Sequence, residues 1–118
     1  MTDTCIFCKI IDGEIPSEKL YMDELVTAFR DISPIAPTHI LIVPNAHIAS
    51  LAEMSEAQAG LLGRMVKVAN DLAVSEGIAE SGYRFITNVG PDAGQAVFHV
   101  HFHLVGGRPL GGMVRRST

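Results

Sequence analysis

The chain has 118 residues, of which 47% are hydrophobic and 19% are charged, and its formal net charge is −4. This length predicts a single domain over residues 1–118, and the apolar runs fall short of the roughly 20 residues of a membrane span. The negative charge argues against broad contact with a nucleic-acid backbone but leaves room for one small phosphate-bearing ligand. The acidic and polar start of the chain lacks the pattern of a signal peptide, so we expect a cytoplasmic protein.

The N-terminal third of the chain predicts a short helix followed by a β-hairpin. Apolar residues within 5–11 recur at helical spacing, and Gly13 ends the pattern. Residues 20–22 and 26–30 then predict two strands around an acidic turn. Residues 31–38 contain two prolines, which remove ladder donors, so we expect a loop there before a strand at 39–43.

The remainder predicts one long helix and two further strands. Ser55, with Gln58 three residues later, fits a capping box, and Gly77 provides the stop. Strands are expected at 83–88 and 97–105. Since strands outnumber helices and most are joined by hairpins, the sequence predicts an α+β fold with a largely antiparallel sheet. The expected buried stripe of the long helix is Leu61, Leu62, Met65, Val66, Ala69 and Leu72.

Three histidines alternate with apolar residues in the last expected strand, as His99, His101 and His103. Alternate side chains of a strand point to opposite faces, so three imidazoles should form a row while the residues between them face the core. Packing does not require a row of ionisable side chains. The pattern therefore indicates either a metal site or an acid–base and nucleophile array, and the spacing alone does not separate the two.

Cys5 and Cys8 form a CxxC motif at the start of the chain. In a reducing compartment this spacing is typical of a metal clip or a redox pair rather than a structural disulfide. A thioredoxin-like redox site would follow a strand, and none is expected before Cys5. A metal clip is therefore the preferred interpretation.

The sequence from His99 to Val105, His-Val-His-Phe-His-Leu-Val, resembles the signature of the histidine triad (HIT) superfamily. Segments 5–16, 28–39 and 106–110 are similar to its Hint branch, so the resemblance spans nearly the whole chain. It implies a homodimer in which each subunit has a five-stranded antiparallel sheet with one long and one short helix. It also implies hydrolysis of nucleoside 5′-phosphoramidates of the AMP-amine type through a nucleotidyl-histidine intermediate.

Carried over position by position, the resemblance implies that His101 is the nucleophile, which attacks the α-phosphate and expels the amine. His103 would contact the phosphate and stabilise charge on its oxygens. His39 would assist from a neighbouring strand, and His99 would complete the triad. The chemistry agrees, because a neutral imidazole is a good nucleophile near pH 7.

The resemblance also implies a pocket for a purine nucleotide. Asp31 would accept hydrogen bonds from the ribose hydroxyls, which suits a carboxylate because it offers only acceptors. Without the resemblance, Asp31 would be taken for a solvated loop residue and the apolar members of the pocket for core. The implied nucleotide-binding residues are Ile6, Phe7, Phe29, Asp31, Ile32, Asn88, Gly94, Gln95, Val97, His101 and His103.

The resemblance bears on the CxxC motif as well, since some HIT relatives with N-terminal cysteines bind zinc. Tetrahedral zinc prefers four nitrogen or sulfur ligands, and Cys5, Cys8, His47 and His99 would supply them. A closed site of four protein ligands leaves no open position, so this zinc would be structural and would fix the orientation of His99. The alternative is a pair of reduced, unliganded thiols.

Ala96 departs from the family pattern, because many Hint relatives have a serine there, near the leaving group. Three further hypotheses stay open. A dinucleoside polyphosphate hydrolase would share the nucleophile but cleave phosphate from phosphate. A nucleotide-binding or regulatory protein with little turnover would fit the missing hydroxyl. A zinc-centred structural module would use the triad itself as the metal cluster.

Overall fold

The computed structural model describes residues 4–114 as one antiparallel sheet with helices on both faces. The sheet has five strands in the order β1-β2-β3-β5-β4, which confirms the predicted α+β fold. Within these residues, no helix is long and apolar enough to cross a bilayer. The strands are β1 (Lys19–Met22), β2 (Val26–Arg30), β3 (Thr38–Pro44), β4 (Tyr83–Ile86) and β5 (Phe102–Gly106), and the α-helices are α1 (Ile6–Ile11) and α2 (Ala59–Ser75).

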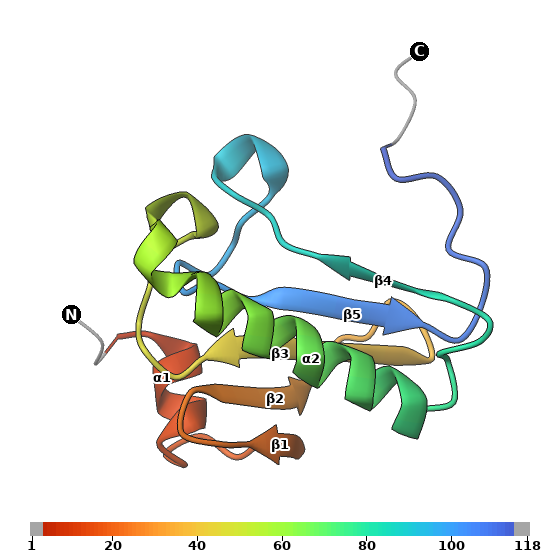
Figure 1. Ribbon diagram of the computed structural model, residues 1–118, viewed down its shortest axis with the longest axis horizontal. Helices are drawn as coiled ribbons and strands as arrows, with labels where there is room; N and C mark the ends of the chain where they lie inside the picture. The colour runs from red at the N-terminus through yellow and green to blue at the C-terminus, as the bar shows by residue number, and fades with distance from the viewer. Residues whose placement is uncertain (1–3, 115–118) are drawn as a thin grey trace.

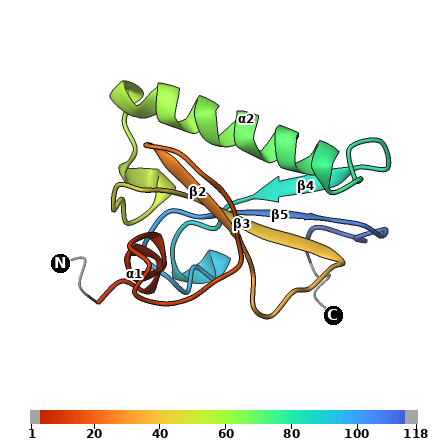
Figure 2. The same ribbon diagram turned by 90° about the horizontal axis from the view of Figure 1, so that it is seen from below.

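The two α-helices cover opposite faces of the sheet. Figure 1 shows α2 lying across the strands, and Figure 2 shows α1 on the other face together with the short 3-10 turn η3 (Pro91–Ala93). β3 lies in the middle of the sheet and all seven of its residues are buried. A strand that is covered on both faces has a nearly continuous run of apolar residues, and this pattern in residues 39–43 predicts the strand.

Two apolar clusters fill the space on either side of the sheet, and alternate residues of each strand divide between them. On the α2 face the cluster includes Val26, Ala28, Ile40, Ile42, Met65, Val100, Phe102 and Leu104. On the α1 face it is smaller and consists of Cys5, Phe7, Ile10, Phe29, Leu41 and Val43. The apolar residues between the histidines thus face the core as predicted, on the α2 side of the sheet, and the histidines lie on the α1 side.

The long helix begins close to the predicted residue, but its first turn is a 3-10 turn, η2 (Glu56–Gln58). The backbone N–H of Ser55 donates to Oε1 of Gln58 at 2.9 Å, as a capping box requires. At the other end Gly77 has a φ of +76°, the left-handed conformation that ends a helix. A second 3-10 turn, η1 (Leu51–Glu53), precedes this region.

The predicted buried stripe of α2 is wrong at Val66, which is 41% exposed. Met65, the preceding residue, is fully buried. Successive side chains of a helix point about 100° apart, and the buried face of a helix is only about that wide, so Val66 points away from the core. Val68 and Ala73 are buried in addition to Ala69.

Both C-terminal strands are shorter than predicted. The last strand begins at Phe102 rather than residue 97, and β4 ends at Ile86 rather than residue 88. The reason is that segment 97–101 leaves the sheet: Val100 donates its N–H to the carbonyl of Ile48 at 2.7 Å instead of to a neighbouring strand. His99 and His101 therefore lie on an irregular segment, and only His103 lies within β5.

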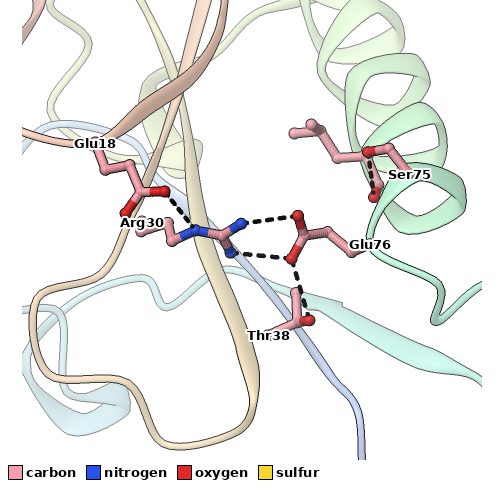
Figure 3. A network of polar contacts seen from close by, with 6 residues as sticks. Glu18, Arg30, Thr38, Ser75 and Glu76 are labelled. Atoms are coloured by element: carbon pink, nitrogen blue, oxygen red, sulfur yellow. Dashed lines mark hydrogen bonds and ion pairs between the residues drawn. The ribbon is translucent and has the colours of Figure 1, made fainter.

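An ion-pair network ties the end of β2 to the C-terminal end of α2 (Figure 3). The Arg30 guanidinium donates to both carboxylate oxygens of Glu76, at 2.9 and 2.8 Å, and its Nε donates to Glu18 at 3.1 Å. Thr38 at the start of β3 donates to the same Glu76 carboxylate. A bidentate pair of this kind fixes orientation as well as distance, so the network anchors the chain directly before Asp31.

Candidate active site and metal centre

The five histidines of the chain gather on the α1 face of the sheet, and the rings divide into two neighbouring groups around His101. His99 lies 5.0 Å from His47, ring centroid to ring centroid. His103 lies 5.2 Å from His39, and His101 lies 5.1 Å from His103. The predicted row of imidazoles is therefore present, although two of its three members lie outside a regular strand.

The orientation of the His101 ring is set by the backbone. Its Nδ1 donates to the carbonyl of His99 at 2.8 Å, and since a carbonyl only accepts, Nδ1 carries the proton. The lone pair of the neutral ring is then on Nε2, the atom that would attack an electrophile. The rings of Phe7 and His101 pack edge to face, with 5.0 Å between their centroids, and 7% of the surface of His101 remains exposed.

His39 and His103 are linked by a chain of hydrogen bonds that begins at the backbone. The Ile35 N–H donates to Nδ1 of His39 at 3.2 Å, so Nε2 of a neutral His39 carries the proton. That proton is donated to Nδ1 of His103, 2.9 Å away, which leaves an N–H on Nε2 of His103. His103 is therefore set up as a hydrogen-bond donor.

Both of these rings are neutral at physiological pH. Burial, together with the charges that His101 and His39 acquire on protonation, lowers the pKa of His103 to about 4. Burial also lowers the pKa of His39, against the opposing effect of the Asp31 carboxylate. The 3.5 Å approach of His39 Nε2 to Asp31 is therefore a contact between a neutral ring and a carboxylate rather than an ion pair.

Asp31, the predicted ribose ligand, is held at the start of the loop after β2. Its Oδ1 accepts the N–H of Ser33 at 2.7 Å, and its Oδ2 lies beside His39. The Arg30 network described above anchors the preceding residue. The structure thus brings Asp31, His39 and His103 together, as the hypothesis of a nucleotide site requires.

Two hollows flank the histidines. A cleft of about 770 Å³ is lined by His39 and His103 together with Asn88 from the segment after β4. A second cavity of about 400 Å³ is lined by Ile6, Ala96 and Val97 among others. Of the predicted nucleotide residues, Asn88 and His103 thus line the larger cleft, and Ile6 and Val97 line the smaller cavity beside His47.

The other members of the predicted pocket differ in exposure. Phe7 and Phe29 are buried and pack edge to face at 5.5 Å. Ile32 is 93% exposed. Gly94 has a φ of +85°, a left-handed conformation that favours glycine, and it ends the 3-10 turn η3.

Gln95, another of the predicted nucleotide-binding residues, is bound to the backbone around it. It is 6% exposed, and its amide is engaged by the backbone: Nε2 donates to the carbonyls of Ala49 and Val97, and Oε1 accepts the Gly90 N–H. Both N–H donors of the amide are thereby used, and neither is left for a phosphate oxygen. Gln95 therefore shapes the loop that carries Gly94 and Val97.

Two contacts at the site were not predicted. Thr87 donates its hydroxyl to the carbonyl of His101 at 2.7 Å, and Ile35 supplies the backbone N–H that fixes the His39 tautomer. No sequence pattern identifies either one, because each depends on where a strand ends in the folded chain.

The four predicted zinc ligands come together at the other end of the triad. Sγ of Cys5 lies 3.3 Å from Nδ1 of His99, and Sγ of Cys8 lies 3.4 Å from Nδ1 of His47 and 3.5 Å from that of His99. All four ligand atoms lie within 4.8 Å of one another. A tetrahedral zinc ion separates its sulfur and nitrogen ligands by about 3.6 Å, so this donor set fits the metal.

The surroundings of the four ligands support the same conclusion. Nε2 of His99 donates to the carbonyl of Pro44 at 2.8 Å, which leaves the Nδ1 lone pair directed at the sulfur atoms. Burial lowers the pKa of His99, so the ring is in the neutral form that binds metals. In the metal-free protein, burial and the neighbouring Cys5 raise the pKa of the Cys8 thiol to about 11.

An antiparallel α+β subunit with a row of histidines beside β5 is the arrangement of a histidine triad protein, and comparison with known sequences agrees. The HIT domain family model matches residues 12–110. The chain belongs to the HIT family. The CxxC motif lies before the matched region, so the Cys5, Cys8, His47 and His99 cluster combines two residues outside that region with two histidines inside it.

Individual relatives resemble nearly the whole chain. It is 56% identical over 114 residues to the purine nucleoside phosphoramidase of Escherichia coli strain K12, covering 97% of this chain and 96% of that protein. It is 50% identical over 107 residues to a 14 kDa zinc-binding protein of Zea mays, covering 89% and 83%. A solved HIT family hydrolase from Clostridium thermocellum superposes with a TM-score of 0.93 at 50% identity, covering 98% of this chain and 100% of that one.

Proposed function

We propose that this protein hydrolyses nucleoside 5′-phosphoramidates, with purine nucleotides of the AMP or GMP type as the nucleotide part. The 56% identity to a purine nucleoside phosphoramidase supports this class of substrate. The observation that carries the proposal is the orientation of His101, whose protonated Nδ1 is held by the His99 carbonyl so that the lone pair is on Nε2. That atom is the nucleophile.

The reaction proceeds in two displacements. Nε2 of His101 attacks the α-phosphorus, the P–N bond breaks, and the leaving amine takes a proton from water, because Ala96 has no hydroxyl to offer. Water then attacks the phosphorus of the nucleotidyl-histidine, loses a proton to solvent and restores His101 with release of the nucleoside monophosphate. Throughout, the N–H on Nε2 of neutral His103 donates to a phosphoryl oxygen as negative charge develops there.

The nucleotide lies across the two hollows. Asp31 accepts hydrogen bonds from the ribose hydroxyls, next to His39, and Asn88 lies at the phosphate end of the 770 Å³ cleft. Phe7, Phe29 and Ile32 form the apolar side on which the base rests. The high exposure of Ile32 gives it a free face for such a contact.

We further propose that Cys5, Cys8, His47 and His99 hold a structural zinc ion. The fit of their separations and the resemblance to a zinc-binding protein support this ligand set. A bound zinc ion would fix the His99 ring, and through the His99 residue the carbonyl that orients His101. Zinc ligation by thiolates also agrees with our expectation of a reducing, cytoplasmic setting.

A homodimer is proposed on the basis of the uncovered side of the molecule. β4 is an edge strand that pairs only with β5 among the described residues, and Val66 and Val74 of the adjacent α2 are 41% and 68% exposed. An exposed edge of this kind is open to pairing with a second chain. Sedimentation of the purified protein, compared with a Val74→Asp variant, tests this assembly.

A single-turnover experiment with an AMP-amine conjugate tests the proposed reaction. We expect the adenylyl group to become attached to His101 in the wild type and to be absent in His101→Ala. Rates on a diadenosine polyphosphate, measured in parallel, test the related hydrolase. A wild-type protein that binds AMP without forming the adduct would show that it is a nucleotide-binding protein instead.

A further inference from the structure

The backbone that carries the nucleophile is not part of either neighbouring ladder. The β3–β5 register ends at Ile42 with Phe102, and the β4–β5 register ends at Ile86 with His103. His101 is the residue directly before β5, so strand pairing does not hold its carbonyl. A buried carbonyl in such a position needs another donor.

Thr87 supplies this donor. It is the first residue after β4, and its Oγ1 donates to the carbonyl oxygen of His101 at 2.7 Å. The side-chain hydroxyl thus extends the connection between the two chain segments by one residue beyond the point where the regular β4–β5 pairing stops. On the other side, the Val100 N–H donates to the Ile48 carbonyl at 2.7 Å.

These two tethers hold a segment whose internal geometry determines the tautomer and direction of the nucleophilic ring. The His101 ring is oriented by the carbonyl of His99, two residues earlier in the same segment. A small rotation of the backbone between these residues would therefore move Nε2 relative to the phosphorus. Even a small displacement of a reacting atom reduces the reaction rate strongly, whereas the contacts that bind the rest of the substrate persist.

We propose that Thr87 is a positioning residue for the hydrolytic reaction, holding the His101 backbone so that its ring attacks in line. This inference rests on the proposed function of His101. It does not require Thr87 to touch the substrate. Its prediction is specific: Thr87 acts through its hydroxyl donor, and the methyl group contributes shape only.

The experiment compares three variants in single-turnover kinetics with an AMP-amine conjugate and in equilibrium binding of AMP. Thr87→Val has the same shape without the donor, and Thr87→Ser keeps the donor. Tyr83→Phe is the matched control, because it removes a hydroxyl at the start of β4, the strand that precedes Thr87, and this hydroxyl donates to Asn70 of α2 at 2.7 Å.

We expect Thr87→Val to slow adduct formation on the order of tenfold with unchanged affinity for AMP, and Thr87→Ser to restore the rate. Tyr83→Phe should form the adduct at the wild-type rate. The inference is overturned if Thr87→Val matches the wild type, if Thr87→Ser fails to restore the rate, or if Tyr83→Phe is slowed equally. A wild-type protein that forms no adduct on His101 overturns the proposed function, and this inference with it, whereas a wild-type rate in Thr87→Val overturns this inference alone.

Discussion

The two ends of the histidine row contain similar side chains but differ in the groups that these side chains contact. At one end, His99 and His47 direct their Nδ1 atoms at the sulfur atoms of Cys5 and Cys8. At the other end, His39 and His103 direct their nitrogens at each other, 2.9 Å apart. The difference follows from the backbone groups that His99 and His39 contact.

A carbonyl and an amide have opposite effects on an imidazole. The Pro44 carbonyl accepts from Nε2 of His99, and this leaves a lone pair on Nδ1 for a metal. The Ile35 amide donates to Nδ1 of His39, which places the proton on Nε2. A metal bound to that Nε2 would displace the proton to Nδ1, where it would face the Ile35 N–H. Asp31, His39 and His103 lie close enough to suggest a metal site, yet this tautomer disfavours one.

Removal of a thiol from the metal end should have the largest effect. We expect Cys8→Ser to abolish zinc binding and to lower the melting temperature by at least about 5 °C, because the closed site loses a ligand and the metal's contribution to folding is lost. Metal content by mass spectrometry and thermal unfolding measure both. As a control, His103→Gln should retain zinc, and a zinc loss in that variant would contradict the division into two ends.

Removal of the donor at the opposite end should slow the reaction without affecting the metal. We expect His103→Gln to reduce kcat by about 10²- to 10³-fold, the usual effect of deleting one donor to a developing oxyanion. Steady-state kinetics on an AMP-amine conjugate measure this, with zinc content as the control. A kcat within a few-fold of wild type would show that His103 does not stabilise the transition state.

The buried, neutral rings at the His39 end should make stability depend on pH. The pKa of His103 falls from 6.5 to about 4 on folding, so the unfolded chain binds a proton that the folded chain does not. Its contribution to stability is therefore complete above about 6.5 and decreases as the pH is lowered toward about 4. Urea unfolding over this pH range should show the decline, and His103→Gln should reduce its slope. An unchanged slope in the variant would assign the decline to other groups.

The smallest predicted effect concerns the leaving group. Ala96→Ser restores a hydroxyl beside Val97, in the cavity next to His47 and Cys5. One added hydrogen bond to the leaving nitrogen should raise kcat by about two- to tenfold, the equivalent of a typical net hydrogen bond. Comparison of amine and aryl-amine conjugates shows whether the gain depends on the basicity of the leaving group. No gain with any leaving group would place the leaving nitrogen elsewhere.

Most of the fold was predictable because its signals are local. The apolar run of β3, the hairpin before it and the capping residues around α2 each predicted an element that the structure confirms. The errors concern the lengths of strands. Both C-terminal strands are shorter than predicted, because the segment 97–101 leaves the sheet and Val100 bonds to Ile48, which follows β3. Val66 was misplaced for a related reason, because a helix's buried face depends on where the sheet meets it.

The sequence by itself determined which side chains are available: alternation placed Val100, Phe102 and Leu104 in the core and left three histidines on the opposite face. The resemblance to the HIT family then indicated the CxxC ligands and Asp31. Only the tertiary structure decided which nitrogen of His39, His99 and His101 carries the proton. Backbone groups of Ile35, Pro44 and His99 set these proton positions. The three residues are far from their partners or outside regular strands, so only the folded chain brings these groups to the rings.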